Sequence, residues 1–202
     1  MSDQRRILMY CHNGKSFGHL RKLQRISQAV MAQDSQASVY CMSSSRYLSR
    51  FVNSGEGIDS IQLPAYRSRI DPLTRESANE YCLHVDSATF YRVRKALIDA
   101  VMRAYRPHVL FMEANPVGKS GEVAAVVEHM GRDRPRVLWG INCVIDPKVS
   151  PLSEPSVRAY CSRHVDEIVV YGDRRISNVP DCEVFDAPLA AKTRYVGYLC
   201  PK

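Results

Sequence analysis

Two hydrophobic patterns alternate along the 202-residue chain. Short continuous apolar runs predict buried β-strands, whereas apolar residues that recur every three or four positions predict amphipathic helices. Seven segments fit the first pattern and are predicted as strands: 6–11, 37–42, 58–63, 108–112, 136–140, 167–171 and 193–196.

Helical spacing fills most of the intervals between these strands. A polar loop is predicted over 65–74, because this stretch has no apolar period. The predicted helices are one over about 20–31, a short one capped by 43–45 and ending at 51, a long one over 75–105 interrupted near 84–87, and two more over 121–130 and 153–164.

Strands that alternate with helices and are apolar on both faces are typical of a parallel sheet covered on both sides. The sequence therefore predicts an α/β fold, a Rossmann-like, doubly wound, mainly parallel sheet of six or seven strands. The length suits a single domain over 1–202. Ligands of such sheets bind beyond the carboxyl ends of the strands, so the residues that follow each strand are the candidates for function.

Composition narrows the class of protein. No segment approaches the ~18 apolar residues that cross a bilayer, and the N-terminus lacks the apolar core of a secretory signal. The seven cysteines are odd in number and form no CxxC pair, so neither a disulfide framework nor a metal site is expected. These features predict a cytoplasmic protein.

The net charge of +7 indicates anionic partners, of which nucleic acid, lipid head groups and phosphorylated ligands are the usual ones. The basic residues are spread along the chain, with no dense run and no basic–aromatic motif. No specific nucleic acid is therefore expected, whereas peripheral contact with a membrane stays open.

Two nucleotide-binding motifs fail. A P-loop requires a glycine five positions before the glycine of its GKS triplet, but Met9 and Glu113 stand at those positions before Gly14 and Gly118. The GxGxxG fingerprint of dinucleotide sites is also absent after the first strand. A classical NAD, FAD or P-loop site is excluded on these grounds.

Five segments, in order along the chain, resemble GT-B glycosyltransferases. Segment 10–22, with its Gly-His-Leu-Arg-Lys, resembles their first strand–loop–helix unit. Segment 106–122 resembles "RPD…D.P.G..GE", segment 139–142 "LGLRD", and segment 166–173 "DEI.VYGD", while 194–198 resembles the stretch that leads to the second domain. The closest resemblance is to bacterial predicted glycosyltransferases related to the lipid-linked N-acetylglucosaminyltransferase of peptidoglycan synthesis.

The resemblance covers only the N-terminal, acceptor-side half of such enzymes. It implies that 197–202 begins an interdomain linker and that the donor-binding half is absent from this chain. It further implies GT-B glycosyltransferase activity only when the chain is joined to a C-terminal donor-binding domain or a separate donor-binding subunit, with no activity alone. The other partner is a sugar acceptor, either a small molecule or lipid-linked. This half would bind no cofactor, and the complete enzyme would use a nucleotide sugar.

The same resemblance points to a catalytic pair. The histidine of the Gly-His pair, here His19, serves as base in many small-molecule GT-B enzymes, and a carboxylate such as Glu113 would orient it. A capping or buried structural histidine is the competing interpretation of His19. The chain departs from the family pattern at Ser16 in place of a loop glycine, at Glu113 in place of an aspartate, and at Asn142-Cys143 in place of an Arg-Asp pair.

Further residues that follow the predicted strands are candidates for substrate binding. His12 is more readily a turn residue, Gly18 either a tight turn or a point of close approach, and Arg67 and Arg69 either solvated loop residues or ligands of an anionic acceptor. The candidate substrate-binding residues are His12, Asn13, Gly18, Arg67, Arg69, Asn115, Gly118 and Asn142.

Two other functions remain open beside the acceptor half of a glycosyltransferase. One is a non-catalytic binding subunit that docks on a separate donor-binding protein, which an exposed apolar surface at the C-terminal sheet edge would favour. The other is a stand-alone Rossmann-like enzyme that binds a nucleotide or sugar nucleotide, against which the missing glycine fingerprint argues.

Overall fold

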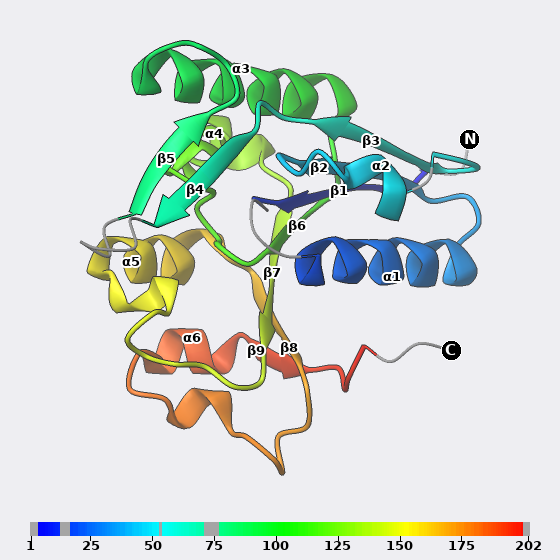
Figure 1. Ribbon diagram of the computed structural model, residues 1–202. Helices are drawn as coiled ribbons and strands as arrows, with labels where there is room; N and C mark the ends of the chain where they lie inside the picture. The colour runs from blue at the N-terminus through cyan, green and yellow to red at the C-terminus, as the bar shows by residue number, and fades with distance from the viewer. Residues whose placement is uncertain (1–3, 13–16, 53, 71–76, 200–202) are drawn as a thin grey trace. The chain divides into compact units, whose positions relative to one another are not determined.

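The computed structural model describes residues 4–12, 17–52, 54–70 and 77–199. The chain forms two compact units, Met1–Pro107 and His108–Lys202 (Figure 1). Each unit has its own parallel strands and its own helices, and each is built around buried apolar side chains.

Parallel strands form the centre of the first unit, in the order β3-β2-β1. Leu8 and Met9 of β1 pair with Tyr40 and Cys41 of β2, and β2 pairs in turn with β3. All the strands that the apolar runs predict in this unit are confirmed. The elements of this part are β1 (Arg6–Cys11), α1 (Gly18–Gln33), β2 (Ser38–Ser43), α2 (Leu48–Phe51) and β3 (Ile58–Gln62).

The prediction for 65–105 is wrong in its first half. In place of a loop and the start of a long helix, β4 (Tyr66–Ile70) and β5 (Ser77–Tyr81) form an antiparallel hairpin. Helix α3 covers Ser87–Tyr105, so the expected interruption near 84–87 is its true beginning. Aromatic packing overrides local helix propensity here, because the Tyr81 ring stacks on Phe90 of α3 at 4.3 Å.

Side chains at the start and in the middle of α3 fix its position within the first unit. The Asp86 carboxylate caps the helix, accepting hydrogen bonds from the Thr89 backbone at 2.8 Å and from its hydroxyl at 2.9 Å. The fully buried Arg94 donates to the Pro64 carbonyl at 2.8 Å and to the Tyr10 hydroxyl of β1 at 3.1 Å. A buried guanidinium needs such partners, because an unpaired buried charge is costly.

The second unit repeats the strand–helix alternation. Its parallel strands lie in the order β6-β7-β8-β9. The predicted strands and helices are confirmed to within a few residues. The elements are β6 (Val109–Glu113), α4 (Glu122–Met130), the 3-10 helix η1 (Gly131–Asp133), β7 (Arg136–Asn142), the 3-10 helix η2 (Pro151–Ser153), α5 (Pro155–His164), β8 (Glu167–Tyr171), the 3-10 helix η3 (Val179–Asp181), α6 (Ala187–Ala191) and β9 (Thr193–Tyr195).

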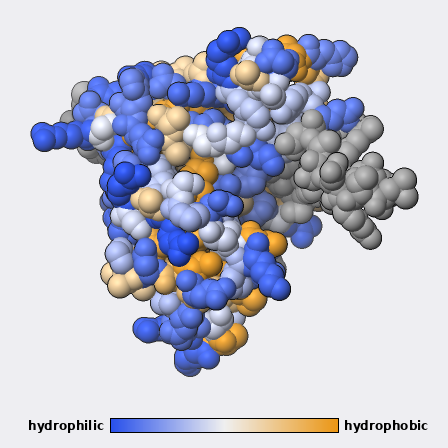
Figure 2. Space-filling view, turned by 90° about the vertical axis from the view of Figure 1, so that its left-hand side faces the viewer, coloured by the Kyte–Doolittle hydropathy of each residue, from blue (hydrophilic) through white to orange (hydrophobic). Residues whose placement is uncertain are grey.

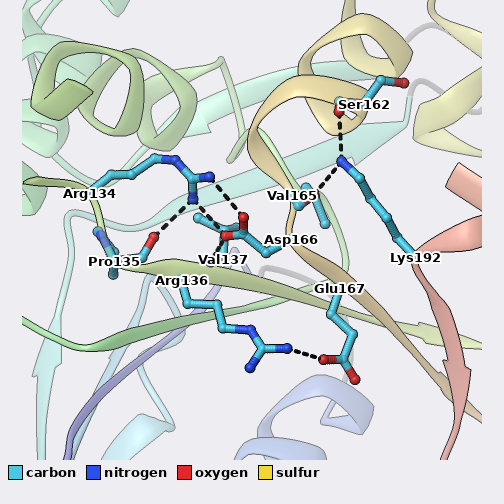
Figure 3. Close-up of polar contacts among 9 residues, drawn as sticks. All are labelled: Arg134, Pro135, Arg136, Val137, Ser162, Val165, Asp166, Glu167 and Lys192. Atoms are coloured by element: carbon cyan, nitrogen blue, oxygen red, sulfur yellow. Dashed lines mark hydrogen bonds and ion pairs between the residues drawn. The ribbon is translucent and has the colours of Figure 1, made fainter. Parts of the chain in front are cut away.

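A network of charged side chains ties the amino ends of β7 and β8 together (Figure 3). Arg134 makes two hydrogen bonds to the Asp166 carboxylate, at 2.6 and 2.8 Å, and the Val137 amide donates a third at 2.7 Å. Burial pushes the Asp166 pKa up, but the hydrogen bonds from Arg134 and Val137 outweigh it and leave this pKa below its ordinary value. Lys192 bonds the Ser162 carbonyl at 2.6 Å, which fastens the end of α5.

Seven parallel strands with flanking helices confirm the predicted Rossmann-like α/β fold. On the face drawn in Figure 2, hydrophilic side chains dominate and the hydrophobic ones form small separate patches. No helix of the described residues is long and apolar enough to cross a membrane.

Candidate functional site

In the first unit, the candidate site lies where β1 ends and α1 begins. His12 follows β1 directly, and Gly18 and His19 form the first turn of α1. The two imidazole rings lie 6.5 Å apart, centroid to centroid. The first turn of α1 contains no acidic residue, and the N-cap Phe17 supplies no side-chain hydrogen bond. The positive end of the helix dipole is therefore not neutralised by the helix itself, which favours a negatively charged or electron-rich ligand there.

An aromatic and cationic group stands beside this turn. Phe17, which is 47% exposed, lies edge-on to Tyr47 and stacks on Phe51, both at 5.2 Å between centroids. The guanidinium groups of Arg46 and Arg50 lie over the Tyr47 ring at 5.2 and 5.5 Å. Such arrangements bind planar or anionic groups. Sequence reasoning missed this group, although Arg46 and Arg50 four residues apart around a tyrosine were the available signal.

Three consecutive serines line the end of β2. Ser43, Ser44 and Ser45 are buried, at 0, 3 and 8% exposure. Ser43 accepts hydrogen bonds from the Cys11 thiol at 3.3 Å and from the Ser45 amide at 3.2 Å. The Ser44 hydroxyl has no hydrogen-bond partner among the described residues. The prediction that 43–45 caps this helix is wrong, because α2 begins at Leu48 and its N-cap Tyr47 makes no side-chain capping hydrogen bond. Ser45 instead accepts a hydrogen bond from the Tyr47 amide at 3.3 Å, which shapes the turn that leads into α2.

In the second unit, the candidate site is a buried pair of acid and phenol. Glu113 ends β6 and Tyr171 ends β8, and the Tyr171 hydroxyl donates to Glu113 Oε2 at 2.7 Å. Glu113 is 1% and Tyr171 6% exposed. The phenol crosses the intervening strand β7 at Gly140, where an added Cβ would meet the Tyr171 hydroxyl and the Glu113 carboxylate within 3 Å. Gly140 therefore provides the space in which the pair forms.

Electrostatics keep this phenol in its donor form. Burial raises the Tyr171 pKa well above the ordinary value of 10.0, and the Glu113 charge and hydrogen bond raise it further. A phenol that stays protonated can only donate to the carboxylate, which fixes the orientation of Glu113. The sequence analysis placed Tyr171 at the end of a predicted strand and in the "DEI.VYGD" resemblance, but assigned it no role.

The loop after β6 is held by its own backbone. Ala114 has a positive φ of 79°, and its carbonyl accepts a hydrogen bond from the Trp139 indole at 3.0 Å. The Asn115 side chain accepts from the Val117 amide at 3.1 Å, as an Asx-turn does. Gly118 has a φ of +83°, a conformation that favours glycine. Asn115 and Gly118 thus shape this loop.

Apolar side chains are exposed at the carboxyl ends of β7, β8 and β9. Because these strands are parallel neighbours, the segments that follow them lie at one edge of the second unit. Asn142, the last residue of β7, is also exposed. The exposed apolar residues at this edge, called the apolar rim below, are Val144 (75%), Val149 (78%), Ile176 (69%), Val196 (51%) and Tyr198 (52%).

The predicted site residues divide between the two units. His19 belongs to the first unit and Glu113 to the second, and their contact as a catalytic pair stays a prediction. Arg67 and Arg69 lie on β4, not in a loop as expected, because the hairpin extends the chain there. The side chains of both arginines, and Asn13, lie outside the described part of the chain.

The described residues contain neither a metal-binding cluster nor a disulfide. Among them, no group of three or more His, Cys, Asp or Glu side chains could hold a metal ion. The described cysteines are free thiols, four of them buried. Burial raises the pKa of Cys41 and of Cys161 to about 12, so both behave as inert core thiols.

Comparison with known proteins supports the fold. No protein-family model matches the sequence, and no curated protein matches it. MurG from Acinetobacter baumannii is similar over 98% of this chain and 46% of its own, with a TM-score of 0.56 and 12% identity. A UDP-N-acetylglucosamine 2-epimerase is similar over 97% of this chain and 49% of its own, with a TM-score of 0.55 and 8% identity. A UGT transferase from Siraitia grosvenorii, solved with UDP, is similar over 87% of this chain and 46% of its own, with a TM-score of 0.53 and 12% identity.

These solved structures are GT-B glycosyltransferases and epimerases, and the fold of this chain resembles one domain of such proteins. The chain spans about half the length of each. At this low identity the likeness establishes only the fold, and any function must be argued from the residues of the site.

Proposed function

We propose that this chain is the acceptor-binding half of a nucleotide-sugar-dependent glycosyltransferase. The observation that carries the proposal is the position of His19, in the first turn of α1 and directly beyond the strand edge at which open α/β sheets bind ligands. The ordered sequence resemblance and the half-length likeness to GT-B structures add support.

His19 would act as the general base. Sugar transfer to a hydroxyl requires a group that removes the acceptor's proton. Glu113, kept oriented by Tyr171, is the carboxylate that would hold one ring nitrogen protonated so that the other is free to accept the proton.

The acceptor proposed for this site is a sugar with a negatively charged group, either free or lipid-linked. Arg46 and Arg50 present guanidinium groups over Tyr47, next to the uncapped start of α1. Guanidinium groups and the positive end of a helix dipole both favour phosphate or carboxylate. The donor would be a nucleotide sugar bound by a second domain or subunit.

Binding measurements on the full chain test this proposal. Calorimetric titration with UDP and UDP-sugars should give no low-micromolar affinity, because the donor-binding half is proposed to lie elsewhere. A glycan array that includes phosphorylated sugars should show binding that Arg46→Ala and Arg50→Ala weaken. Low-micromolar binding of UDP or a UDP-sugar would contradict the proposal and favour a stand-alone nucleotide-binding enzyme.

The apolar rim favours a second candidate, a binding subunit that docks on a separate donor-binding protein. Exposed apolar patches on a soluble domain mark contact surfaces, and this one lies at the edge where β7, β8 and β9 end. Under this alternative, Val144→Lys and Val196→Lys abolish association with the donor-binding subunit in analytical ultracentrifugation. The chain alone then binds neither glycans nor UDP-sugars.

A further inference from the structure

A pocket lies in the first unit at the amino ends of β2 and β3, at the opposite ends of these strands from the candidate site. Its volume is about 430 Å³, within the range of small-molecule sites. None of its lining residues has a role in the proposed sugar transfer. The lining residues are Ser38, Val39, Tyr40, Ser54, Gly55, Gly57, Ile58, Asp59 and Tyr105.

Two aromatic rings form one wall of this pocket. Tyr40 comes from β2 and Tyr105 from the last turn of α3, and their ring centroids lie 5.6 Å apart with the planes tilted by 56°. The Tyr105 hydroxyl donates to the Ser38 carbonyl at 2.7 Å, which holds its ring in place. Tilted aromatic faces that are fixed in this way attract cations through the ring quadrupole.

A carboxylate faces the same pocket. Asp59 of β3 accepts hydrogen bonds at Oδ1 from the Ser54 hydroxyl at 2.8 Å and from the Ser60 amide at 2.7 Å. Its other oxygen, Oδ2, receives no hydrogen bond from any described residue. The Ser54 hydroxyl and then the Ser60 amide lower the Asp59 pKa, so this group is ionised at neutral pH.

Three of the donors that line the pocket are already used inside the protein. The hydroxyls of Ser54 and Tyr105 already donate within the protein, as does the Ile58 amide, which bonds the Gly55 carbonyl at 3.1 Å. No lining residue is basic, although the whole chain carries +7. A ligand that complements this lining brings N–H donors and a positive charge.

We propose that this pocket binds a small organic cation with N–H donors, a guanidinium or primary ammonium compound, held between the Tyr40 and Tyr105 rings and the Asp59 carboxylate. The aromatic faces contact the cation, and Asp59 Oδ2 accepts its hydrogen bonds. This site does not depend on the proposed glycosyltransferase function, because none of its residues lies at the carboxyl ends of the strands.

Matched probes separate charge from shape. Methylguanidinium and methylurea have nearly the same planar outline, but only the first is charged, and methylurea has a carbonyl oxygen in place of one NH2 group. Titration of the ¹⁵N-labelled full chain with methylguanidinium should shift the amide signals of Val39, Gly57 and Ser60, with a millimolar dissociation constant. Methylurea should leave these signals unchanged. Equal shifts with both probes, or no shift with methylguanidinium at tens of millimolar, would overturn the proposal.

Matched variants test which residues bind. Asp59→Asn keeps the shape and removes the charge, and it should weaken methylguanidinium binding by about two- to five-fold. Glu56→Gln removes the same charge from an exposed neighbour that does not line the pocket, and it should leave the affinity unchanged. Tyr40→Leu should weaken binding by about three-fold through loss of one ring. An equal effect of Glu56→Gln and Asp59→Asn would mean unspecific charge attraction and refute the site.

Discussion

The carboxyl ends of β1 and β2 carry histidines, arginines and aromatic rings that are partly exposed, whereas those of β6 and β8 carry a carboxylate and a phenol that are almost fully buried. Equivalent edges of the two units thus differ in kind. The first presents groups that can bind or take a proton from a ligand. The second holds one carboxylate rigidly, by a hydrogen bond from a protonated phenol that passes over a glycine.

The difference indicates that the exposed groups of the first unit contribute mainly to activity and the buried pair of the second unit mainly to stability. Ligand-facing groups should matter for activity and little for folding, because exposed residues contribute little to stability. The buried pair should matter for stability first, because removing one partner leaves a buried polar group without its hydrogen bond. Each prediction below tests one side of this contrast, in order of decreasing expected effect.

The largest effect is expected for the proposed base. In the chain joined to a donor-binding domain, His19→Ala should lower kcat by about 10²–10⁴-fold and change the free energy of unfolding by only about 0.5 kcal/mol. His129→Ala, at an exposed position on α4, is the control and should change neither. Steady-state kinetics and urea unfolding give the two readings. Turnover within a few-fold of wild type would remove His19 from the mechanism and make His12 the next candidate.

The next effect concerns the space that Gly140 leaves for Tyr171. Gly140→Ala places a Cβ 1.9 Å from the Tyr171 hydroxyl, and such overpacking should cost about 1–3 kcal/mol of stability. Gly55→Ala is the control, because an added Cβ there meets nothing within 4 Å. Thermal unfolding followed by circular dichroism measures both. An unchanged melting temperature for Gly140→Ala would show that the pair is loosely held.

Two buried tyrosines of the second unit provide a test of similar size, with a matched control. Tyr171→Phe removes the hydrogen bond to Glu113 and should destabilise the chain by about 1.5–3 kcal/mol, the usual value for a bond to a charged group. The Tyr160 hydroxyl has no hydrogen-bond partner among the described residues, so Tyr160→Phe should be neutral or stabilising. Denaturant unfolding compares the two variants, and equal losses would mean that the Glu113 bond contributes nothing special.

The smallest effect is a pH dependence at the amino ends of β7 and β8. The Asp166 pKa lies below its unfolded value, so this carboxylate stabilises the fold above about pH 4, and the contribution is lost as pH falls through the folded pKa. Asp166→Asn should remove about 1 kcal/mol or less at neutral pH, since the pair with Arg134 is partly exposed. It should also flatten the acid side of the stability profile. Urea unfolding of both proteins between pH 2 and 7 measures this dependence, and an equal slope of stability against pH in the two would contradict the role of Asp166.

Local features of the fold could be predicted from the sequence, whereas features that depend on long-range contacts could not. The runs at 6–11 and 167–171 predicted β1 and β8 with the observed bounds, because a continuous apolar run buries itself on both faces of a sheet wherever it lies. The hairpin of β4 and β5 was missed, because its packing depends on contacts between residues far apart in the sequence, such as Tyr66 of β4 with Phe90 of α3.

The sequence by itself determined the α/β class, the parallel strands and the residues that follow each strand, since these depend on hydrophobic period and chain order. Only the tertiary structure decided that Tyr171 reaches Glu113 over Gly140, that Arg46 and Arg50 gather on Tyr47, and that Tyr40, Tyr105 and Asp59 share a pocket. Most of these contacts join residues far apart in the chain. Their geometry depends on strand register and side-chain packing, which no local pattern of polar and apolar residues encodes.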